Sequence, residues 1–351
     1  MKIGIYDPYL KTLGGGENYI LTIASGLARN HSVSIFWQDP NILDEAQKRF
    51  NLDLSGVSVV QNMFVPRVSF QQKISFTRSY DVIFFVSDGS IPWLFAKKNF
   101  LIIQHPLPWV KQTVFAKLKL TRIKKILVYS DFVKKFLDKT FGKESFVLAP
   151  AIEQIAFDAK KKENVILTVG RFTEGMNTKK QAEMIDAFKS LYDGGFKGWE
   201  LVLIGSSLKE NNDFITALKK SASGYPIKIL PDASRDLLVS YYQKAKIYWH
   251  AAGINEDLST HPERAEHFGI TTVEAMSAGA VPVVIDAGGQ TEIVSKGNAG
   301  ILWKTIEDLQ AQTKRLASDK NLLQEYSVRA NKRAQDFSKE TFYKTLETLV
   351  S

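Results

Sequence analysis

The chain has 351 residues, about two ordinary domains in length, and 44% of them are hydrophobic, enough for two cores. It has no cysteine, which excludes a disulfide framework and thiolate metal sites and fits a reducing compartment. No stretch approaches the ~18 apolar residues of a membrane span, and Asp7 stands where a signal peptide would be apolar. We therefore expect a cytoplasmic protein, soluble or peripheral on the inner face of the membrane.

The net charge of +9 is unevenly distributed. Residues 1–150 hold 20 Lys and Arg against 11 Asp and Glu, whereas the remainder holds 26 of each. Lys97 to Lys143 alone carries 12 basic and two acidic residues. So much positive charge in one segment predicts an anionic partner. An anionic membrane surface or a phosphorylated lipid fits it; because no aromatic stacking platform is apparent there, we do not expect nucleic acid.

The first half of the chain alternates short apolar runs with helical or polar segments. Strands are predicted at 2–6, 32–37, 57–61, 81–86, 99–104, 124–129 and 146–148. Repeated βα units imply a parallel, doubly wound sheet, which binds ligands beyond the carboxyl ends of its strands. Gly14-Gly15-Gly16 and Gln104-His105 both follow such strands. Three glycines or one histidine in these places also suit a plain turn or simple packing, so both interpretations remain open.

The segment 110–123 is both basic and apolar. Its lysines do not gather on one helical face, since Lys111 falls among Val110, Val114 and Leu118. One interpretation is a solvated helix whose lysine stems cover apolar surface. The other is a helix that lies on a membrane surface.

The second half restarts the same pattern after a polar linker at 158–164. Strands are predicted at 165–169, 200–204, 227–230, 247–250 and 281–285, and helices at 179–192, 237–245, 305–317, 320–335 and 339–350. The sequence therefore predicts Rossmann-like domains at 1–155 and 160–336, with a closing helix at 337–351 that packs on the first domain.

The passage 266–294 carries the most chemical information; it reads EHFGITTVEAMSAGAVPVVIDAGGQTEIV. Glu266 and Glu274 stand eight positions apart in it. Gly269 frees the backbone before a helix, a following threonine suits the N-cap, and the first helical N–H groups attract anions. Two isolated glutamates would be read as solvated helix carboxylates. The intact string around them favours a phosphate site with a carboxylate on either side.

This passage resembles the signature of family 4 of the glycosyltransferases, a retaining family with the GT-B fold, in which two Rossmann-like domains face each other across a cleft. That signature has two glutamates eight apart with Phe-Gly between them, followed by a Glu-Ala-Met helix. The resemblance implies that Glu266 lies by the donor sugar and that Glu274 binds the ribose. It also implies that the intervening residues form the donor-binding loop, with amides that meet the diphosphate: Phe268, Gly269, Ile270, Thr271 and Thr272.

The resemblance extends to other loops. It implies that Arg171 and a lysine neutralise the diphosphate as it leaves, and Lys179 matches that lysine better than Lys180. The family usually has glycine after this lysine, so the choice between the two stays open. His105 would reach the donor sugar and the acceptor. Four glycines would line the donor site: Gly15, Gly16, Gly170 and Gly205.

The implied function is metal-independent, retaining transfer of a mannose-type or glucose-type hexose from a nucleotide-diphosphate sugar to a glycan or polyprenyl-linked acceptor. The chain has no Asp-x-Asp motif, so we expect neither a metal nor a cofactor. A nucleotide-sugar epimerase of the same fold and a non-catalytic nucleotide-sugar or lipid-binding protein are the alternatives. The sequence identifies neither the base, the sugar, the acceptor nor the oligomeric state.

Overall fold

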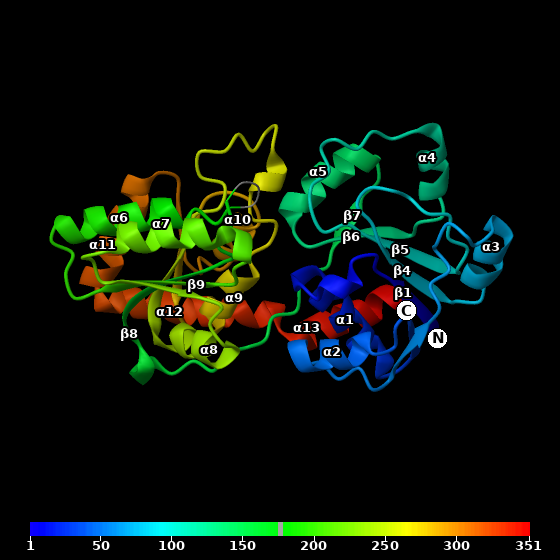
Figure 1. The fold of residues 1–351 in the computed structure, drawn as a ribbon, viewed down its shortest axis with the longest axis horizontal. Helices are drawn as coiled ribbons and strands as arrows, with labels where there is room; N and C mark the ends of the chain where they lie inside the picture. Colours follow the sequence, from blue (N-terminus) through cyan, green and yellow to red (C-terminus); the bar gives the residue numbers. More distant parts are fainter. Residues whose placement is uncertain (175–177) are drawn as a thin grey trace. The chain divides into compact units, whose positions relative to one another are not determined.

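A computed structural model describes residues 1–174 and 178–351, and it divides into two compact units. The first comprises Met1–Ala151 with Lys339–Ser351, and the second comprises Ile152–Ser338. Each unit is a parallel sheet with helices on both faces (Figure 1). The chain enters the second unit at Ile152, a few residues earlier than the pattern suggested, and its last helix, α13 (Lys339–Val350), belongs to the first unit.

The first unit contains a seven-stranded sheet. Its strands, in spatial order, are β3 (Val57–Val60), β2 (Ser32–Phe36), β1 (Lys2–Tyr6), β4 (Val82–Val86), β5 (Lys98–Ile102), β6 (Lys125–Val128) and β7 (Ser145–Val147). Helices α1 (Gly15–Ala28), α2 (Ile42–Phe50) and α13 lie along one face, and α4 (Val114–Leu120) and α5 (Asp131–Phe141) along the other (Figure 1). A further helix, α3, spans Phe70–Arg78. The order reverses between β1 and β4, the first of two switch points.

The second unit contains a six-stranded sheet. Its strands, in spatial order, are β10 (Ile227–Pro231), β9 (Glu200–Gly205), β8 (Glu163–Val169), β11 (Ala245–His250), β12 (Val281–Ile285) and β13 (Ile301–Trp303). Helices α6 (Gln181–Asp193), α7 (Asn212–Ala222) and α11 (Ile306–Ser318) cover one face, and α8 (Arg235–Lys244), α9 (Ile270–Ser277) and α12 (Lys320–Ala334) the other (Figure 1). The order reverses between β8 and β11, the second switch point.

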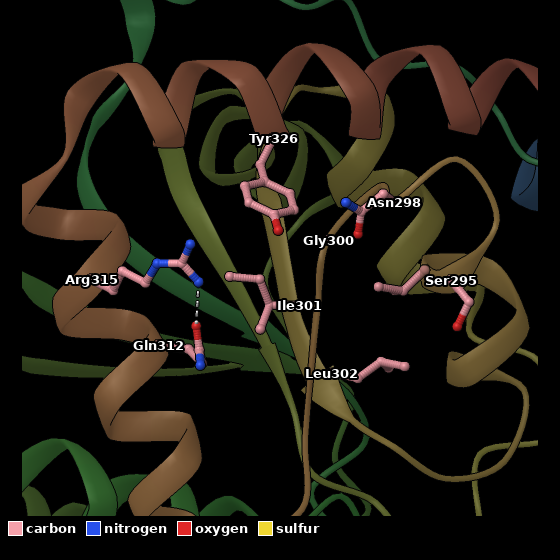
Figure 2. A pocket seen from close by; sticks show the side chains of 9 residues that line it. Ser295, Asn298, Gly300, Ile301, Leu302, Gln312, Arg315 and Tyr326 are labelled. Carbon is pink, nitrogen blue, oxygen red and sulfur yellow. Dashed lines mark hydrogen bonds between the residues drawn. The ribbon is translucent and has the colours of Figure 1, made fainter.

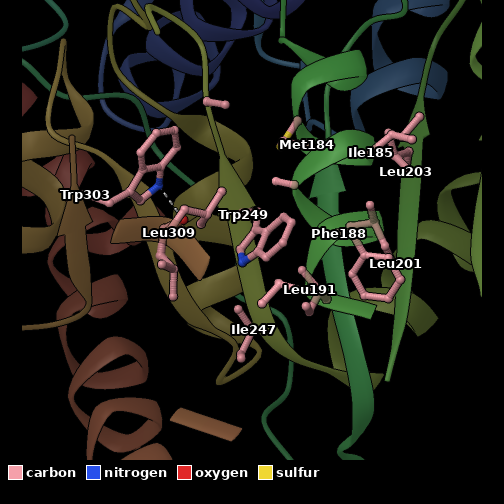
Figure 3. Packing of buried hydrophobic residues seen from close by; sticks show 14 of the residues in the cluster. Met184, Ile185, Phe188, Leu191, Leu201, Leu203, Ile247, Trp249, Trp303 and Leu309 are labelled. Atoms are coloured by element: carbon pink, nitrogen blue, oxygen red, sulfur yellow. Dashed lines mark hydrogen bonds between the residues drawn. The ribbon is translucent and has the colours of Figure 1, made fainter. Parts of the chain in front are cut away.

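Side-chain alternation along β11 divides this strand between two faces of the sheet. Ile247 and Trp249 point into the core beneath α6, where Figure 3 shows Trp249 beside Phe188 and Leu191. The Trp249 indole donates to Thr313 Oγ1 on α11 at 3.0 Å. The alternate residues, Tyr248 and His250, therefore face the α9 side, where both are buried.

The predicted strands are confirmed to within two residues. Strand β13 and helix α7 were not predicted, and several other helical details differ. The expected helix at 110–123 is only the seven-residue α4, which starts at Val114 after a Thr113 N-cap. The helix expected from 179 begins at Gln181, because Lys180 takes a left-handed conformation with φ of 57°. The short helix α10 (Gln290–Ser295) was not predicted.

Candidate donor-binding site

The switch point of the second unit brings together the carboxyl ends of β8 and β11. Open α/β sheets bind their ligands there, because the connections diverge to opposite faces and leave a crevice. β8 runs into Gly170 and Arg171, and β11 ends at His250. The loop that carries Glu266 reaches the same edge, since its carboxylate contacts His250.

One oxygen of Glu266 accepts two hydrogen bonds. Lys179 Nζ lies 2.7 Å from Glu266 Oε2, and His250 Nε2 lies 2.9 Å from the same atom. Burial of the carboxyl opposes its ionisation, but the Lys179 ammonium and the His250 hydrogen bond outweigh that effect and hold the pKa of Glu266 well below its usual value. Glu266 is therefore a carboxylate at any ordinary pH.

His250 was missed in the sequence, although it is the polar residue that ends a buried strand. Its side chain is 3% exposed. Burial lowers the pKa of His250, against the raising influence of Glu266, so the imidazole is neutral at pH 7. A carboxylate accepts and does not donate, so the proton lies on Nε2. The buried Nδ1 atom has no hydrogen-bond partner among the described residues.

The two neighbouring lysines serve different carboxylates. Lys180 Nζ lies 2.8 Å from Glu256, and Arg264 Nη1 contacts the same carboxylate at 2.8 Å. Lys180 thus ties the loop after β11 to the start of α6, while Lys179 faces Glu266. Of the two lysines, Lys179 is therefore the one that contacts Glu266.

Two of the predicted glycines allow loops to meet at this edge. A Cβ on Gly205 would lie 1.9 Å from the Gly170 carbonyl oxygen, so the ends of β9 and β8 touch only because Gly205 has no side chain. A Cβ on Gly170 would lie 2.6 Å from Lys179 Cγ. The stem of Lys179 therefore rests on Gly170, which directs its ammonium toward Glu266.

The start of α9 differs from the expected threonine cap. Gly269 is the N-cap, with φ of 126°, a conformation that favours glycine. Thr271 Oγ1 instead bonds to the Tyr248 hydroxyl at 2.7 Å, and Thr272 is fully buried. The Thr272 N–H already donates to the Gly269 carbonyl at 3.1 Å. Within the described chain, the N–H groups of Ile270 and Thr271 have no acceptor, so two of the three expected amides are free to donate to an anion.

Glu274 is held from both sides by α8. The Tyr242 hydroxyl donates to Oε2 at 2.8 Å, and Arg235 Nη2 lies 2.8 Å from Oε1. Glu274 is only 8% exposed, and burial raises its pKa while Arg235 opposes that rise. The carboxylate predicted to meet ribose is thus already in contact with two side chains, and neither partner was foreseen.

Phe268 and Arg171 have contrasting surroundings. Phe268 is 3% exposed and packs edge-on against Phe337, with ring centroids 5.3 Å apart, so its side chain belongs to the core. Arg171 is exposed, and no carboxylate among the described residues pairs with it. Its carbonyl accepts from Gln181 Nε2 at 2.9 Å, which fixes its backbone beside the start of α6.

The first unit holds the remaining candidates beyond the ends of β1 and β5. Gly15 opens α1, and the Glu17 carboxylate accepts from the Gly14 N–H. Gln104 Nε2 donates to the Gly16 carbonyl at 3.3 Å, so the glycine loop and the segment bearing His105 lie together. Burial lowers the pKa of His105, although Asp88 opposes the change.

Other surface features lie apart from these residues. A recess of about 400 Å³ at the edge strand β13 is shown in Figure 2, where Arg315 bonds to Gln312 beside Tyr326; its lining contains none of the predicted site residues. Residues 1–174 and 178–351 contain no cluster of three or more His, Asp or Glu suited to a metal ion. No helix in those residues has the length and hydropathy to cross a bilayer.

Comparison with known proteins identifies the family. The sequence pattern of the glycosyl transferases group 1 matches residues 152–335, just over half of the chain. The chain belongs to this family. Among curated proteins, it is similar to the alpha-1,3/1,6-mannosyltransferase ALG2 of Dictyostelium discoideum, with 26% identity over 61% of this chain and 52% of that protein. The chain thus spans about half the length of this curated relative.

Solved glycosyltransferase structures match this group 1 member across almost its whole length. Anabaena Alr3699/HepE, solved in complex with UDP, gives a TM-score of 0.75 at 18% identity and covers 99% of both chains. A glycosyltransferase from Rickettsia africae gives 0.73 at 14% identity, with 99% of this chain and 97% of that one covered. The likeness confirms the predicted fold, two Rossmann-like sheets of the GT-B class.

Proposed function

We propose that the chain is a retaining, metal-independent glycosyltransferase that moves a hexose from a nucleotide-diphosphate sugar to a glycan or lipid-linked acceptor. One observation is the main support for the proposal. Lys179, which contacts Glu266, lies near a switch point, and the unpaired amides of Ile270 and Thr271 lie in the same segment as the carboxylates of Glu266 and Glu274. A sugar joined through a diphosphate to a nucleoside presents anions for the cations and amides, and hydroxyls for the carboxylates.

The cations and amides account for the leaving group. Preorganised donors aimed at developing negative charge stabilise a transition state strongly, and charge-assisted hydrogen bonds to phosphate are the strong kind. We assign Arg171, Lys179 and the α9 amides to the diphosphate. As Lys179 turns to phosphate, Glu266 is released to accept from sugar hydroxyls. Glu274 accepts from the ribose.

The reaction we propose keeps the anomeric configuration. The bond between the sugar C1 and the phosphate oxygen breaks while the acceptor oxygen bonds to C1 on the same face. The acceptor hydroxyl proton passes to the departing phosphate oxygen. Glu266 holds the sugar and does not attack it. Arg171 and Lys179 take the role that a divalent ion plays in metal-dependent transferases.

A mannose donor and action at a membrane surface are the finer part of the proposal. The curated relative is named as a mannosyltransferase. On α4 and the loop before it, four large apolar side chains are markedly exposed: Trp109 at 58%, Val114 at 83%, Phe115 at 74% and Leu118 at 53%. Lys111, Lys117 and Lys119 lie among them. Apolar side chains interleaved with lysines suit an anionic bilayer better than water.

A donor and acceptor panel tests the proposed function. The full chain is screened by thermal shift against UDP, GDP, ADP and their sugars, and then assayed with glycan and polyprenyl-linked acceptors. We expect one nucleotide series to raise the melting temperature and its sugar to be transferred with retained configuration, read by NMR. An altered free sugar nucleotide formed without acceptor would indicate an epimerase. Binding without turnover across the panel would indicate a binding protein.

A further inference from the structure

We propose that His250 is a positioning residue that fixes the carboxylate of Glu266 for the donor sugar, before and after Lys179 turns to the diphosphate. This inference rests on the proposed function, because it assigns a second residue to the same site. Three features of the structure lead to it. Lys179 and His250 share one oxygen of Glu266, His250 is buried, and these two partners of Glu266 differ in rigidity.

Both partners of Glu266 contact Oε2. No hydrogen bond from the described residues reaches Oε1, which therefore remains available to hydroxyls of a ligand. A carboxylate held through one oxygen presents the other in a defined direction. The contacts that fix Oε2 thus set where a sugar hydroxyl is accepted.

The two partners differ in how firmly they are anchored. Lys179 reaches Glu266 through a flexible four-carbon stem from a loop residue, and its ammonium is the group that an incoming diphosphate attracts. His250 ends a strand paired on both sides, with Trp249 beside it locked in the core and Tyr248 bonded to Thr271. Its ring is fully enclosed and has no long stem to relax. When Lys179 leaves, the His250 bond is the one that persists.

The neutral Nε2–H tautomer makes this contact a simple hydrogen bond. The charged groups that face His250 are Glu266 and Lys179. A second cation permanently at the ring would attract the diphosphate or draw the carboxylate away from the sugar. A neutral donor orients Glu266 without competing for the phosphate, so its effect is expected on turnover and not on nucleotide binding.

Three substitutions of His250 test whether it orients the Glu266 carboxylate or only packs against it. A glutamine amide nitrogen reaches about as far from the backbone as His Nε2, whereas asparagine places its amide near Nδ1 and alanine has none. We expect H250N and H250A to lower kcat by about 10- to 100-fold, the scale of a misplacement near 1 Å, with little change in donor KM. H250Q should recover to within about threefold. Nucleoside diphosphate affinity should stay within about twofold for all three variants, since ribose and phosphate contacts are intact.

The matched control uses a histidine–glutamate contact of the first unit. His31 Nε2 lies 3.1 Å from Glu347 Oε2 in the first unit, and His31→Asn should leave turnover unchanged. If H250Q, H250N and H250A all lose the same share of kcat, in step with a lower melting temperature, His250 has only a packing role. That result would overturn the inference. So would full activity in H250N. If a variant fails to fold, H250N is compared in the Glu266→Gln background. There it should lower kcat by a smaller factor than it does in the wild type.

Failure of the inference and of the proposed function are distinguishable. Suppose that the wild-type chain binds nucleotide and transfers sugar, and that the His250 variants keep the wild-type kcat. This result removes only the positioning role. A wild-type chain that neither binds a nucleoside diphosphate nor transfers sugar removes both.

Discussion

Arg235 Nη2 lies 2.8 Å from Glu274 Oε1, and the same guanidinium nitrogen lies 3.4 Å from Glu153 Oε2. One cation therefore stands between a buried carboxylate and an exposed one. Because Tyr242 also comes from α8, a single helix determines both the charge and the direction of Glu274. The position of α8 therefore sets the direction of the Glu274 carboxylate, which we assign to the ribose.

Replacing Arg235 tests that dependence. Arg235→Met should lower nucleoside diphosphate affinity by about tenfold, because a hydrogen bond to a charged group contributes roughly 1.5–3 kcal/mol and Glu274 would lose its cation. Isothermal calorimetry measures the change. A 2′,3′-dideoxynucleoside diphosphate should show almost no difference between variant and wild type. An equal loss for both ligands would place Arg235 on the phosphate or base instead. Arg329→Met, which removes a surface pair with Glu325, is the control.

Arg171 tests the assignment of the leaving group. Arg171→Ala should reduce turnover at least about 100-fold, the scale lost with one preorganised donor, and should weaken binding of the diphosphate more than that of the nucleoside. Steady-state kinetics and competition binding read out both effects. Arg67→Ala, an exposed arginine of the first unit, should change neither. An unaltered rate for Arg171→Ala would remove it from the site.

Chelation tests the metal-independent part of the proposal. Incubation with EDTA should leave transfer at its original rate, because the charge of the diphosphate is met by Arg171, Lys179 and the α9 amides. The rate is measured before and after dialysis against the chelator. Activity that disappears and returns with magnesium would contradict this expectation.

The exposed face of α4 predicts binding to anionic vesicles. Neutralising Lys117, Lys119, Lys124 and Lys125 together should weaken binding by about two to three orders of magnitude, since each lysine near such a surface contributes ~1 kcal/mol. Phe115→Ser should weaken binding to anionic vesicles by less, through lost apolar burial. Cosedimentation measures both, with neutral vesicles and a matched set of lysine substitutions in the second unit as controls. Binding that survives the four substitutions would reject the membrane surface.

Asp7 predicts a pH dependence of stability. Burial raises its pKa from 3.8 to about 7, while the Tyr9 amide opposes the shift. Between these values the folded protein holds a proton that the unfolded chain has released, so the contribution of Asp7 to stability falls as pH rises from about 4 to 7. Asp7→Asn carries no such proton. Its stability relative to wild type should therefore rise over that window, by at most about 4 kcal/mol.

Urea unfolding at several pH values checks this prediction. Asp39→Asn, at an exposed aspartate of the same unit, is the matched control. Parallel stability curves for Asp7→Asn and wild type would show that Asp7 ionises normally in the folded chain.

The sequence by itself determined the two βα-repeating halves and the stretch around Glu266 and Glu274. Periodicity and turn residues are local properties, so a strand such as β12 and a helix such as α13 could be read with their bounds intact. The spacing of the two glutamates is local as well. The family pattern and the related structures agree with that reading.

Only the tertiary structure decided which side chains meet these glutamates. His250 and Lys179 reach Glu266 from separate strands and loops, and Arg235 reaches Glu274 from another helix. Phe268, expected in the donor-binding loop, has its side chain packed on Phe337, a contact that the sequence did not predict. Such pairings depend on the order in which strands assemble and on which face each residue presents. A histidine at the end of an apolar strand reveals neither until the chain has folded around it.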